Sequence, residues 1–258
     1  NKLKELYGQL YDDAMKIKLS NFFPICGSEY SRENVVRLMV VGRSVDGWDE
    51  FNASSKEEFI KSAEKSMKNR GFSWLGNAEL AGDNDNELAS ESYINRSGNE
   101  VHYNLRTSPF WRTVKEITRR LHGWDENTIP SRWYEHIIWN NLYAISPKDG
   151  GNPDDAMQKI QRSTCRALLR EQFREYAPTH ILFITGQNWF HTFWGDDPLC
   201  DITDLTDRQK CGKYPVGYGL YGNSRVVITM RPEFRTPSDI IGGAMVAFES
   251  LGKSKGSS

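Results

Sequence analysis

The stretch IIWNNLYAISPKDGGNPDDAMQKIQRSTCRALLREQF, residues 137–173, decides the fold class of this chain. Its beginning is apolar, rich in β-branched residues and followed by turn residues, so it predicts a buried strand over residues 137–145. A helix then begins where Asn152 provides an N-cap and Pro153 suits the first helical position. Pro178 ends this helix, because proline cannot continue the helical hydrogen bonds. The stretch is therefore one strand–loop–helix unit of an α/β protein.

Three further segments have the composition of buried strands and alternate with amphipathic helices. The strands are expected at residues 35–42, 179–186 and 225–230, and the helices at residues 54–71, 108–123 and 236–251. This alternation predicts a doubly wound α/β fold, with a mainly parallel four-stranded sheet and helices on both faces. Gly222 and Asn223 predict a hairpin turn that adds an antiparallel strand at residues 218–221. Residues 75–104 and 195–215 are polar and have no periodic pattern, so we expect irregular loops there.

Length and composition predict one water-soluble domain. A chain of 258 residues can bury a large core without a metal or a disulfide, and no segment has the composition of a linker. We expect a single domain over residues 1–251 and a disordered tail, GKSKGSS, over residues 252–258. The mean hydropathy is −0.63, and no apolar run approaches the roughly 20 residues that span a bilayer, so we expect no membrane partner.

The cysteines and the N-terminal segment predict a cytoplasmic protein. Cys26, Cys165, Cys200 and Cys211 are scattered without a CxxC pair, which favours free thiols in a reducing compartment. The N-terminal residues are charged and have a helical pattern rather than that of a signal peptide. The sequence contains no P-loop, GxGxxG, HExxH or GxSxG motif and no zinc-like pairing of histidine with cysteine. We therefore expect neither a metal nor another cofactor.

The candidate site residues follow the predicted strands, because ligands of open α/β sheets bind beyond the carboxyl ends of the strands. After the first strand, Gly42 allows a ligand to approach the backbone, Asp46 is the first carboxylate, and Trp48 can stack on a ring. The alternative is a tight turn in which Asp46 caps backbone amides. At the second strand, Asn140 and Asn141 each offer a donor and an acceptor, which suits the edge of a nucleobase. The alternative there is a buried asparagine that bonds to local backbone.

Arginines follow the fourth predicted strand. Arg231 and Arg235 stand in the segment MRPEFR, residues 230–235, where guanidinium groups can bind phosphates. They are equally able to pair with the aspartate-rich segment at residues 195–207. The formal net charge of −1 is unusual for a sequence-specific DNA-binding protein. Residues 101–123, however, carry five basic residues against one acid, so one basic face is compatible with this total.

With these residues in view, the chain resembles the uracil-DNA glycosylase superfamily in the order and spacing of its motifs over residues 35–251. The segments that carry the resemblance are VVGRSVDGW (40–48), SPFWRTV (108–114), NNLYAISP with the helix after it (140–173), APTHILFITG (177–186) and MRPEFR (230–235). The proline usual in the family's first loop is absent, and Arg231 stands where the family has a histidine. The four cysteines of the family's iron–sulfur branch, which include a CxxC pair, are also absent.

The resemblance implies a DNA glycosylase that hydrolyses the N-glycosidic bond of uracil or another altered base, with parallel strands in the order 2-1-3-4. Asp46 would orient or activate water, and Arg231 would stabilise the negative charge that develops on the departing base. The target nucleotide would leave the base stack, and Asn141 or its neighbour would read the base edge. The expected substrate-binding residues are Gly42, Trp48, Asn140, Asn141 and Arg235.

Two other functions stay open beside this one. The first is a catalytically silent relative that binds nucleic acid or a protein partner through the same cleft. The second is a small-molecule enzyme, acting on free nucleosides, on the same fold, because fold alone does not determine function. Binding to DNA is expected to be weak to moderate and salt-sensitive, since a near-neutral chain neutralises only a few phosphates and each adds about 0.9 to the salt slope.

Overall fold

The structure is a computed structural model that describes residues 2–14, 19–44, 49–50, 55–68, 92–94, 100–102, 108–147, 151–195, 202–210, 213–233 and 235–253. The candidate residues Asp46 and Trp48 and most of the expected tail lie outside these described residues. Within them, no helix combines the length and the apolar character needed to cross a membrane.

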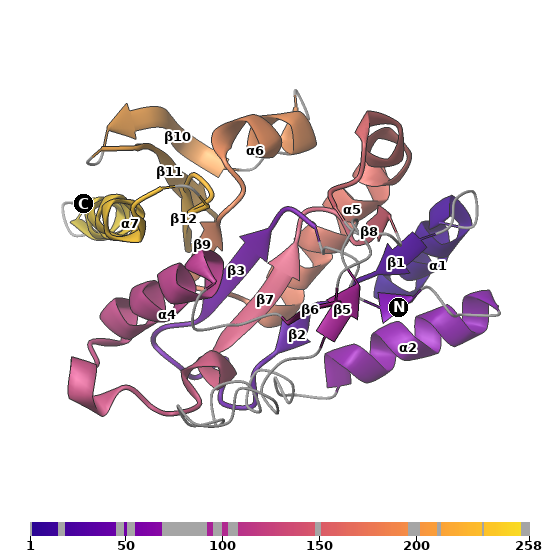
Figure 1. The fold of residues 1–258 in the computed structure, drawn as a ribbon, viewed down its shortest axis with the longest axis horizontal. Coiled ribbons are helices and arrows are strands. Elements are labelled where there is room, and N and C mark those ends of the chain that lie inside the picture. The colour runs from indigo at the N-terminus through magenta and orange to yellow at the C-terminus, as the bar shows by residue number, and fades with distance from the viewer. Residues whose placement is uncertain are drawn as a thin grey trace.

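A seven-stranded mixed sheet forms the centre of the molecule (Figure 1). In spatial order its strands are β10 (Ile202–Lys210), β11 (Pro215–Tyr221), β12 (Ser224–Ile228), β9 (His180–Phe183), β3 (Leu38–Gly42), β7 (Ile137–Asn141) and β2 (Ile25–Cys26). The strands β12, β9, β3 and β7 run parallel, and their order confirms the predicted 2-1-3-4 arrangement. The sheet is larger than the predicted four-stranded sheet because β2, β11 and β10 extend it with antiparallel pairs.

Two small antiparallel sheets accompany the main one. Their strands are β4 (Asp49–Glu50), β1 (Leu19–Asn21) and β8 (Ile145–Pro147) in the first, and β5 (Ser92–Ile94) and β6 (Glu100–His102) in the second. The prediction of irregular loops was therefore wrong where β5, β6 and β10 lie. Their polar sequences carry no strand period, and it is backbone pairing with a neighbouring strand that defines them. The predicted hairpin between β11 and β12 is confirmed.

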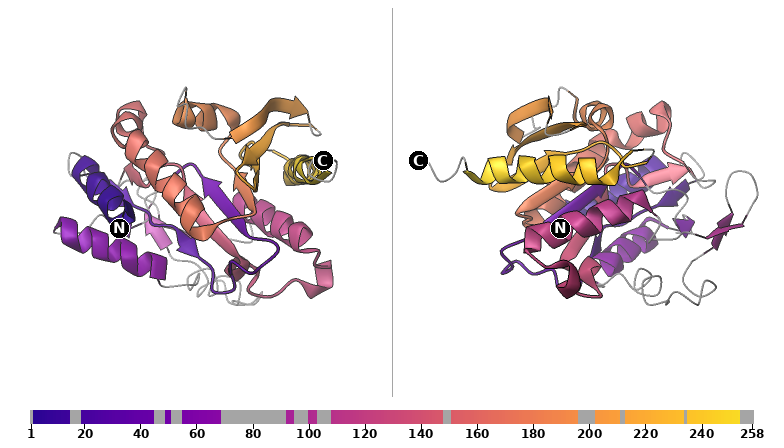
Figure 2. Two further views of the ribbon diagram at one scale, coloured as in Figure 1. Left: turned by 180° about the vertical axis from the view of Figure 1, so that it is seen from behind. Right: turned by 60° about the vertical axis from the view of Figure 1, so that its left-hand side comes forward.

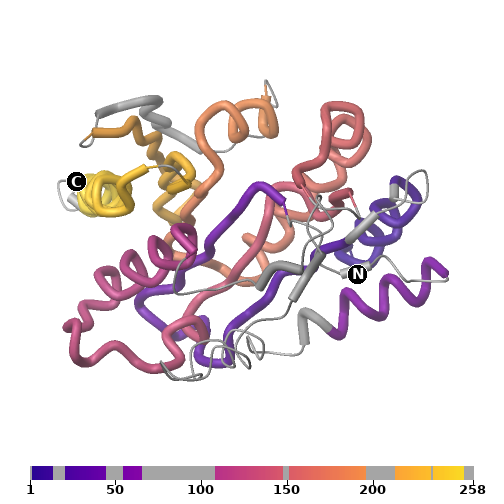
Figure 3. The backbone as a smooth tube through the Cα atoms, in the orientation of Figure 1, coloured from indigo at the N-terminus to yellow at the C-terminus, as the bar shows by residue number. Residues whose placement is uncertain are grey.

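Helices cover both faces of the main sheet, as predicted (Figure 2). The helices α1 (Lys2–Ala14), α5 (Asp155–Tyr176) and α6 (Gln187–Trp194) pack on one face, and α4 (Pro109–His122) and α7 (Pro237–Lys253) on the other. The helix α2 (Lys56–Lys68) packs beside α1, and the short 3-10 helices η1 (Glu126–Thr128) and η2 (Trp133–His136) precede β7. The first and last helices lie on opposite sides of the molecule (Figure 3).

The central strand β3 is buried on both faces because helices cover both faces of the sheet. Met39 and Val41 belong to the core beneath α5, and Leu38 and Val40 belong to the core beneath α4. All four side chains are 0% exposed. A strand buried in this way has a continuous apolar run instead of an alternating one, which is typical of parallel sheets.

The second predicted strand ends earlier than expected. β7 stops at Asn141, although the amides of Leu142 and Tyr143 still donate to backbone oxygens at the end of β3, at 2.9 and 3.0 Å. Ile145 then pairs with β1 in a different sheet. The apolar run that predicted one strand is therefore divided between two sheets.

Two helix starts show how the caps operate. In α5 the N-cap is Asp154 instead of the expected Asn152, and its carboxylate accepts a hydrogen bond from Met157 N at 2.8 Å. In α4 the predicted boundaries are confirmed, because Ser108 caps the N-terminus and Gly123 ends the helix at a φ of 68°.

His122, which is half-buried, and His180, which is buried, are both neutral in the folded chain at physiological pH. His122 stacks on Trp124, with ring centroids 4.4 Å apart, and its Nε2 has no hydrogen-bond partner among the described residues. His180 begins β9 and is 8% exposed. Burial lowers the pKa of each imidazole to about 4, with further lowering by His136 for His122 and by Arg225 for His180.

We expect the free energy of unfolding to decrease as the pH falls from 6.5 to about 4. In this window the unfolded chain binds protons at His122 and His180 that the folded chain excludes, whereas above it both states are neutral. His122→Phe keeps the ring stack on Trp124 and removes one of these groups. Urea unfolding at a series of pH values should therefore show a shallower loss of stability in the variant. Equal slopes for variant and wild type would contradict this prediction.

Candidate functional site

The carboxyl ends of β7, β3, β9 and β12 lie at one edge of the sheet, because these four strands are parallel. Gly42 at the end of β3 is paired directly with Asn141 at the end of β7. Arg231 and Arg235 follow β12, on the same edge. β3 and β9 separate β7 from β12, so Asn141 and Arg231 do not end neighbouring strands. At a strand spacing of about 4.8 Å, the two strands are about 14 Å apart.

The side chain of Asn141 lies across Gly42. A Cβ atom at Gly42 would stand 2.4 Å from Asn141 Oδ1, so only glycine leaves room for this amide. Asn141 is 5% exposed, and its Nδ2 has no hydrogen-bond partner among the described residues. A buried donor without a partner costs about 1–3 kcal/mol. A ligand that brings an acceptor to this amide would recover that free energy.

Asn140 points to the other face of the sheet and is engaged there. Its Nδ2 donates to Gln172 Oε1 at 2.6 Å, and its Oδ1 accepts from the amide of Asn141 at 2.8 Å. Gln172 in turn donates to Tyr7 Oη at 3.1 Å. These bonds join β7 to α5 and α1. Asn140 thus has the structural role that was the alternative for this pair, and Asn141 is the member whose side-chain amide nitrogen has no hydrogen-bond partner among the described residues.

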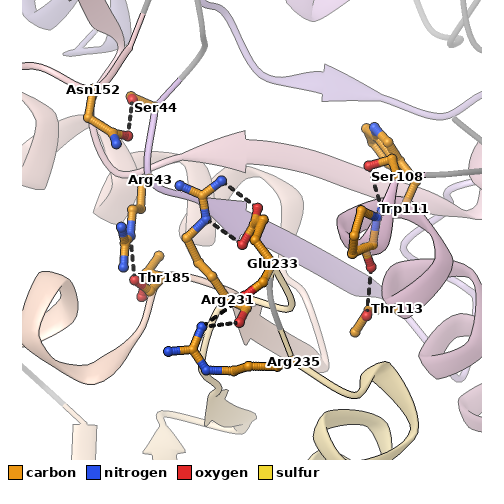
Figure 4. A network of polar contacts seen from close by, with 11 residues as sticks. Arg43, Ser44, Ser108, Trp111, Thr113, Asn152, Thr185, Arg231, Glu233 and Arg235 are labelled. Carbon is orange, nitrogen blue, oxygen red and sulfur yellow. Dashed lines mark hydrogen bonds and ion pairs between the residues drawn. The ribbon is translucent and has the colours of Figure 1, made fainter. Parts of the chain in front are cut away.

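Arg231 is bound to a carboxylate in its own loop. Its Nε donates to Glu233 Oε2 at 2.9 Å, and its Nη2 donates to the other oxygen of the same carboxylate (Figure 4). Arg235 Nη1 donates to the backbone oxygens of Arg231 and Glu233, at 3.0 and 3.1 Å. The described partner of Arg231 is therefore Glu233, whose charge neutralises that guanidinium.

Arg43 belongs to the same edge, and the sequence reasoning assigned it no role. Its Nε donates to Thr185 O at 2.6 Å, and its guanidinium carbon lies 4.8 Å from the ring centroid of Trp189. Burial and the nearby charges of Arg231 and Arg235, partly offset by Glu233, lower the pKa of Arg43 to about 10. The signal was its position directly after Gly42, at the strand end that had already supplied the candidates Gly42, Asp46 and Trp48.

Part of the basic segment around α4 is engaged in local ion pairs. Glu116 pairs with Arg119 at 2.7 Å and with Arg120 at 2.6 Å. The two guanidinium groups hold the pKa of Glu116 at about 2. This part of the segment is a helix face with local ion pairs. Arg43, Arg231 and Arg235 are the arginines that follow the parallel strands at the carboxyl edge.

The described residues gather no set of three or more histidine, cysteine, aspartate or glutamate side chains suited to a metal ion. Cys26 and Cys165 are buried free thiols, and the other two cysteines lie outside the described residues. No protein-family model matches the sequence, and no curated protein matches it significantly. The function must therefore be argued from the residues of this edge.

Gly42→Ala is expected to destabilise the protein by about 1–3 kcal/mol, because the new methyl group collides with the Asn141 amide. Asn141→Ala in the same chain removes the collision, so the double variant should recover much of this loss. Gly242→Ala is the matched control, since its Cβ would meet nothing within 4 Å and it lies within a helix. That variant should be as stable as wild type or more stable. Urea unfolding of wild type, the two single variants and the double variant measures the coupling, with Gly242→Ala as a fifth protein for control. Additive effects at Gly42 and Asn141 would contradict the contact.

Proposed function

We propose that this protein is a DNA glycosylase that hydrolyses the N-glycosidic bond of uracil or another altered base. The observation that carries the proposal is the buried Asn141 amide at the carboxyl edge of the parallel strands, which lacks a partner for Nδ2 among the described residues. Buried polar groups are nearly always hydrogen-bonded, so such an exception at a ligand-binding edge favours a recognition role.

The chemistry of an asparagine amide suits a pyrimidine edge. The amide offers donors on Nδ2 and an acceptor on Oδ1, and the edge of uracil presents a carbonyl oxygen beside an N–H group. Gly42 supports this role because its missing side chain allows the amide to lie flat against the end of β3. The strand order 2-1-3-4 also supports it, since this order is the one that the resemblance to the uracil-DNA glycosylase superfamily implies.

In the proposed mechanism a nucleotide leaves the base stack, and Asn141 reads its base edge while Trp48 stacks on the ring. Asp46 orients water toward the sugar carbon that loses the base. A cation at the same edge stabilises the negative charge on the departing base, a contribution that is worth about 3 kcal/mol for a preorganised donor. We assign this part to Arg231, with Arg235 and Gly42 completing the substrate-binding set.

The fork between Arg231 and Glu233 favours a second candidate function. A guanidinium that is already neutralised by a carboxylate stabilises a departing anion less than a free one. A catalytically silent relative that binds nucleic acid through the same edge would tolerate this pairing. Glu233→Gln distinguishes the two, because it should raise the rate of base release in a glycosylase.

The test is incubation with oligonucleotides that contain uracil, hypoxanthine or a mismatch, followed by alkali to cleave abasic sites. Wild type should release a base, and Asp46→Ala should slow release by at least about 100-fold, because water activation acts in the chemical step. DNA binding, measured by fluorescence anisotropy, should stay nearly unchanged in Asp46→Ala.

Asn141→Ala should reduce discrimination between bases more than it reduces binding to DNA, since it removes a donor and an acceptor from the base edge. Arg174→Ala is the control, because Arg174 is an exposed residue near the end of α5. DNA binding without base release from any of these substrates would favour the silent relative. The absence of both would leave a small-molecule enzyme as the remaining function.

A further inference from the structure

The three arginines of the carboxyl edge form one cluster of positive charge. Arg43 follows β3, and Arg231 and Arg235 follow β12, with the end of β9 between them (Figure 4). Arg43 lies close enough to the other two for their charges to lower its pKa. Of the carboxylates that the structure describes, Glu233 is the one that contacts this cluster. Three guanidinium groups thus share one described counter-charge.

The donors of this cluster are unequally used. Glu233 occupies Nε and Nη2 of Arg231, and backbone oxygens occupy Nη1 of Arg235. Arg43 uses only Nε, in its bond to Thr185 O, and has no carboxylate partner among the described residues. Within the described part of the chain its two terminal nitrogens therefore keep their N–H donors, in the fork geometry that matches carboxylates and phosphates.

Arg43 is held in place before any ligand arrives. The bond to Thr185 O, at 2.6 Å, fixes one edge of the guanidinium, and the ring of Trp189 supports its face at 4.8 Å. Trp189 is itself packed edge-on against Tyr143, with ring centroids 5.9 Å apart. A side chain fixed in this way loses little conformational entropy on binding, which favours affinity.

Repulsion between the three guanidinium groups raises the free energy of this arrangement when no anion is bound. Like charges close to one another disfavour the charged form of each, and partial burial removes the water that would otherwise screen them. The charges of Arg231 and Arg235 lower the pKa of Arg43 in this way, and the charge of Glu233 offsets only part of that lowering. A bound anion would relieve the repulsion and satisfy the free donors together.

We propose that Arg43, Arg231 and Arg235 form a binding site for a phosphate group, in which Arg43 makes the fork contact. Guanidinium groups bind phosphate oxygens in pairs, and tetrahedral phosphate can contact several guanidinium groups at once. The inference rests on the proposed function in one respect, since the phosphate would then be a phosphodiester of the DNA strand. A free nucleoside monophosphate presents the same chemistry to the site.

Two probes test the site and identify the source of the phosphate. The first is inorganic phosphate, whose effect on the melting temperature is compared with chloride at equal ionic strength. The second is a labelled oligothymidylate, which contains no altered base and therefore reports binding without base release. Arg43→Gln is compared with Arg174→Gln, which removes the same charge from an exposed side chain. The acid that pairs with Arg174 is Glu171, which retains Lys2 at 2.8 Å.

Wild type should be stabilised by phosphate and should bind the oligothymidylate. Arg43→Gln should lower the affinity for each of these two probes by about tenfold. The salt slope for the oligonucleotide should also decrease by about 0.7 for each lost contact with a single strand. Arg174→Gln should retain the wild-type behaviour, which includes the general stabilisation of folded proteins by phosphate. Arg235→Gln, and Arg43→Lys if the glutamine variant does not fold, should show a smaller loss in the same direction.

Each outcome is decisive for the site. Equal responses of wild type, Arg43→Gln and Arg235→Gln to both probes would overturn the proposal. A response to inorganic phosphate that depends on Arg43, with oligonucleotide binding that does not, would support the site with a free phosphate compound as its ligand. Base release is measured separately, so a failure of the glycosylase assay with Arg43-dependent binding would overturn the proposed function and leave the phosphate site standing.

Discussion

The pairing of β3 with β7 on one side and β9 on the other is the constraint on which the rest of the molecule depends. Because β3 is buried on both faces, its register is set by two apolar cores at once. The same register places Gly42 against Asn141 and brings Arg43 to Thr185. A slip of one residue would exchange the two faces of the strand and place a side chain across the Asn141 amide. The core and the candidate site are thus specified by one set of backbone bonds.

The two adjacent asparagines show how strand alternation separates a structural role from a binding role. Asn140 faces α5, where its amide belongs to a chain of bonds through Gln172 to Tyr7. Similar bonds hold the loop after β7, since Gln161 both accepts from and donates to the backbone of Ile145. Asn141 faces the opposite side and has no such network for Nδ2 among the described residues. The satisfied amides stabilise the fold, and the unsatisfied one is the group to which the proposed function assigns base recognition.

The positions and order of the parallel strands could be predicted because the signals are local. Apolar β-branched runs give the strands, and capping residues such as Ser108 give the helix starts. The edge that carries the site followed from topology alone. Its details did not, because the face of Asn140, the pairing of Arg231 with Glu233 and the position of Arg43 depend on contacts with elements distant in sequence. The roles of Asp46 and Trp48 remain predictions, since both lie outside the described residues.

The formal net charge of −1 does not determine which charged ligands this edge can bind. At physiological ionic strength the Debye length is about 8 Å, so a bound anion responds to the charges around it and not to the total. Around Arg43 those described charges are two further guanidinium groups and one carboxylate. Partial burial strengthens their field, since less water screens it. Concentrating like charges at the ends of parallel strands is unfavourable for folding unless a counter-charge or a ligand offsets them. The physical basis for binding is therefore a local excess of donors on a rigid frame.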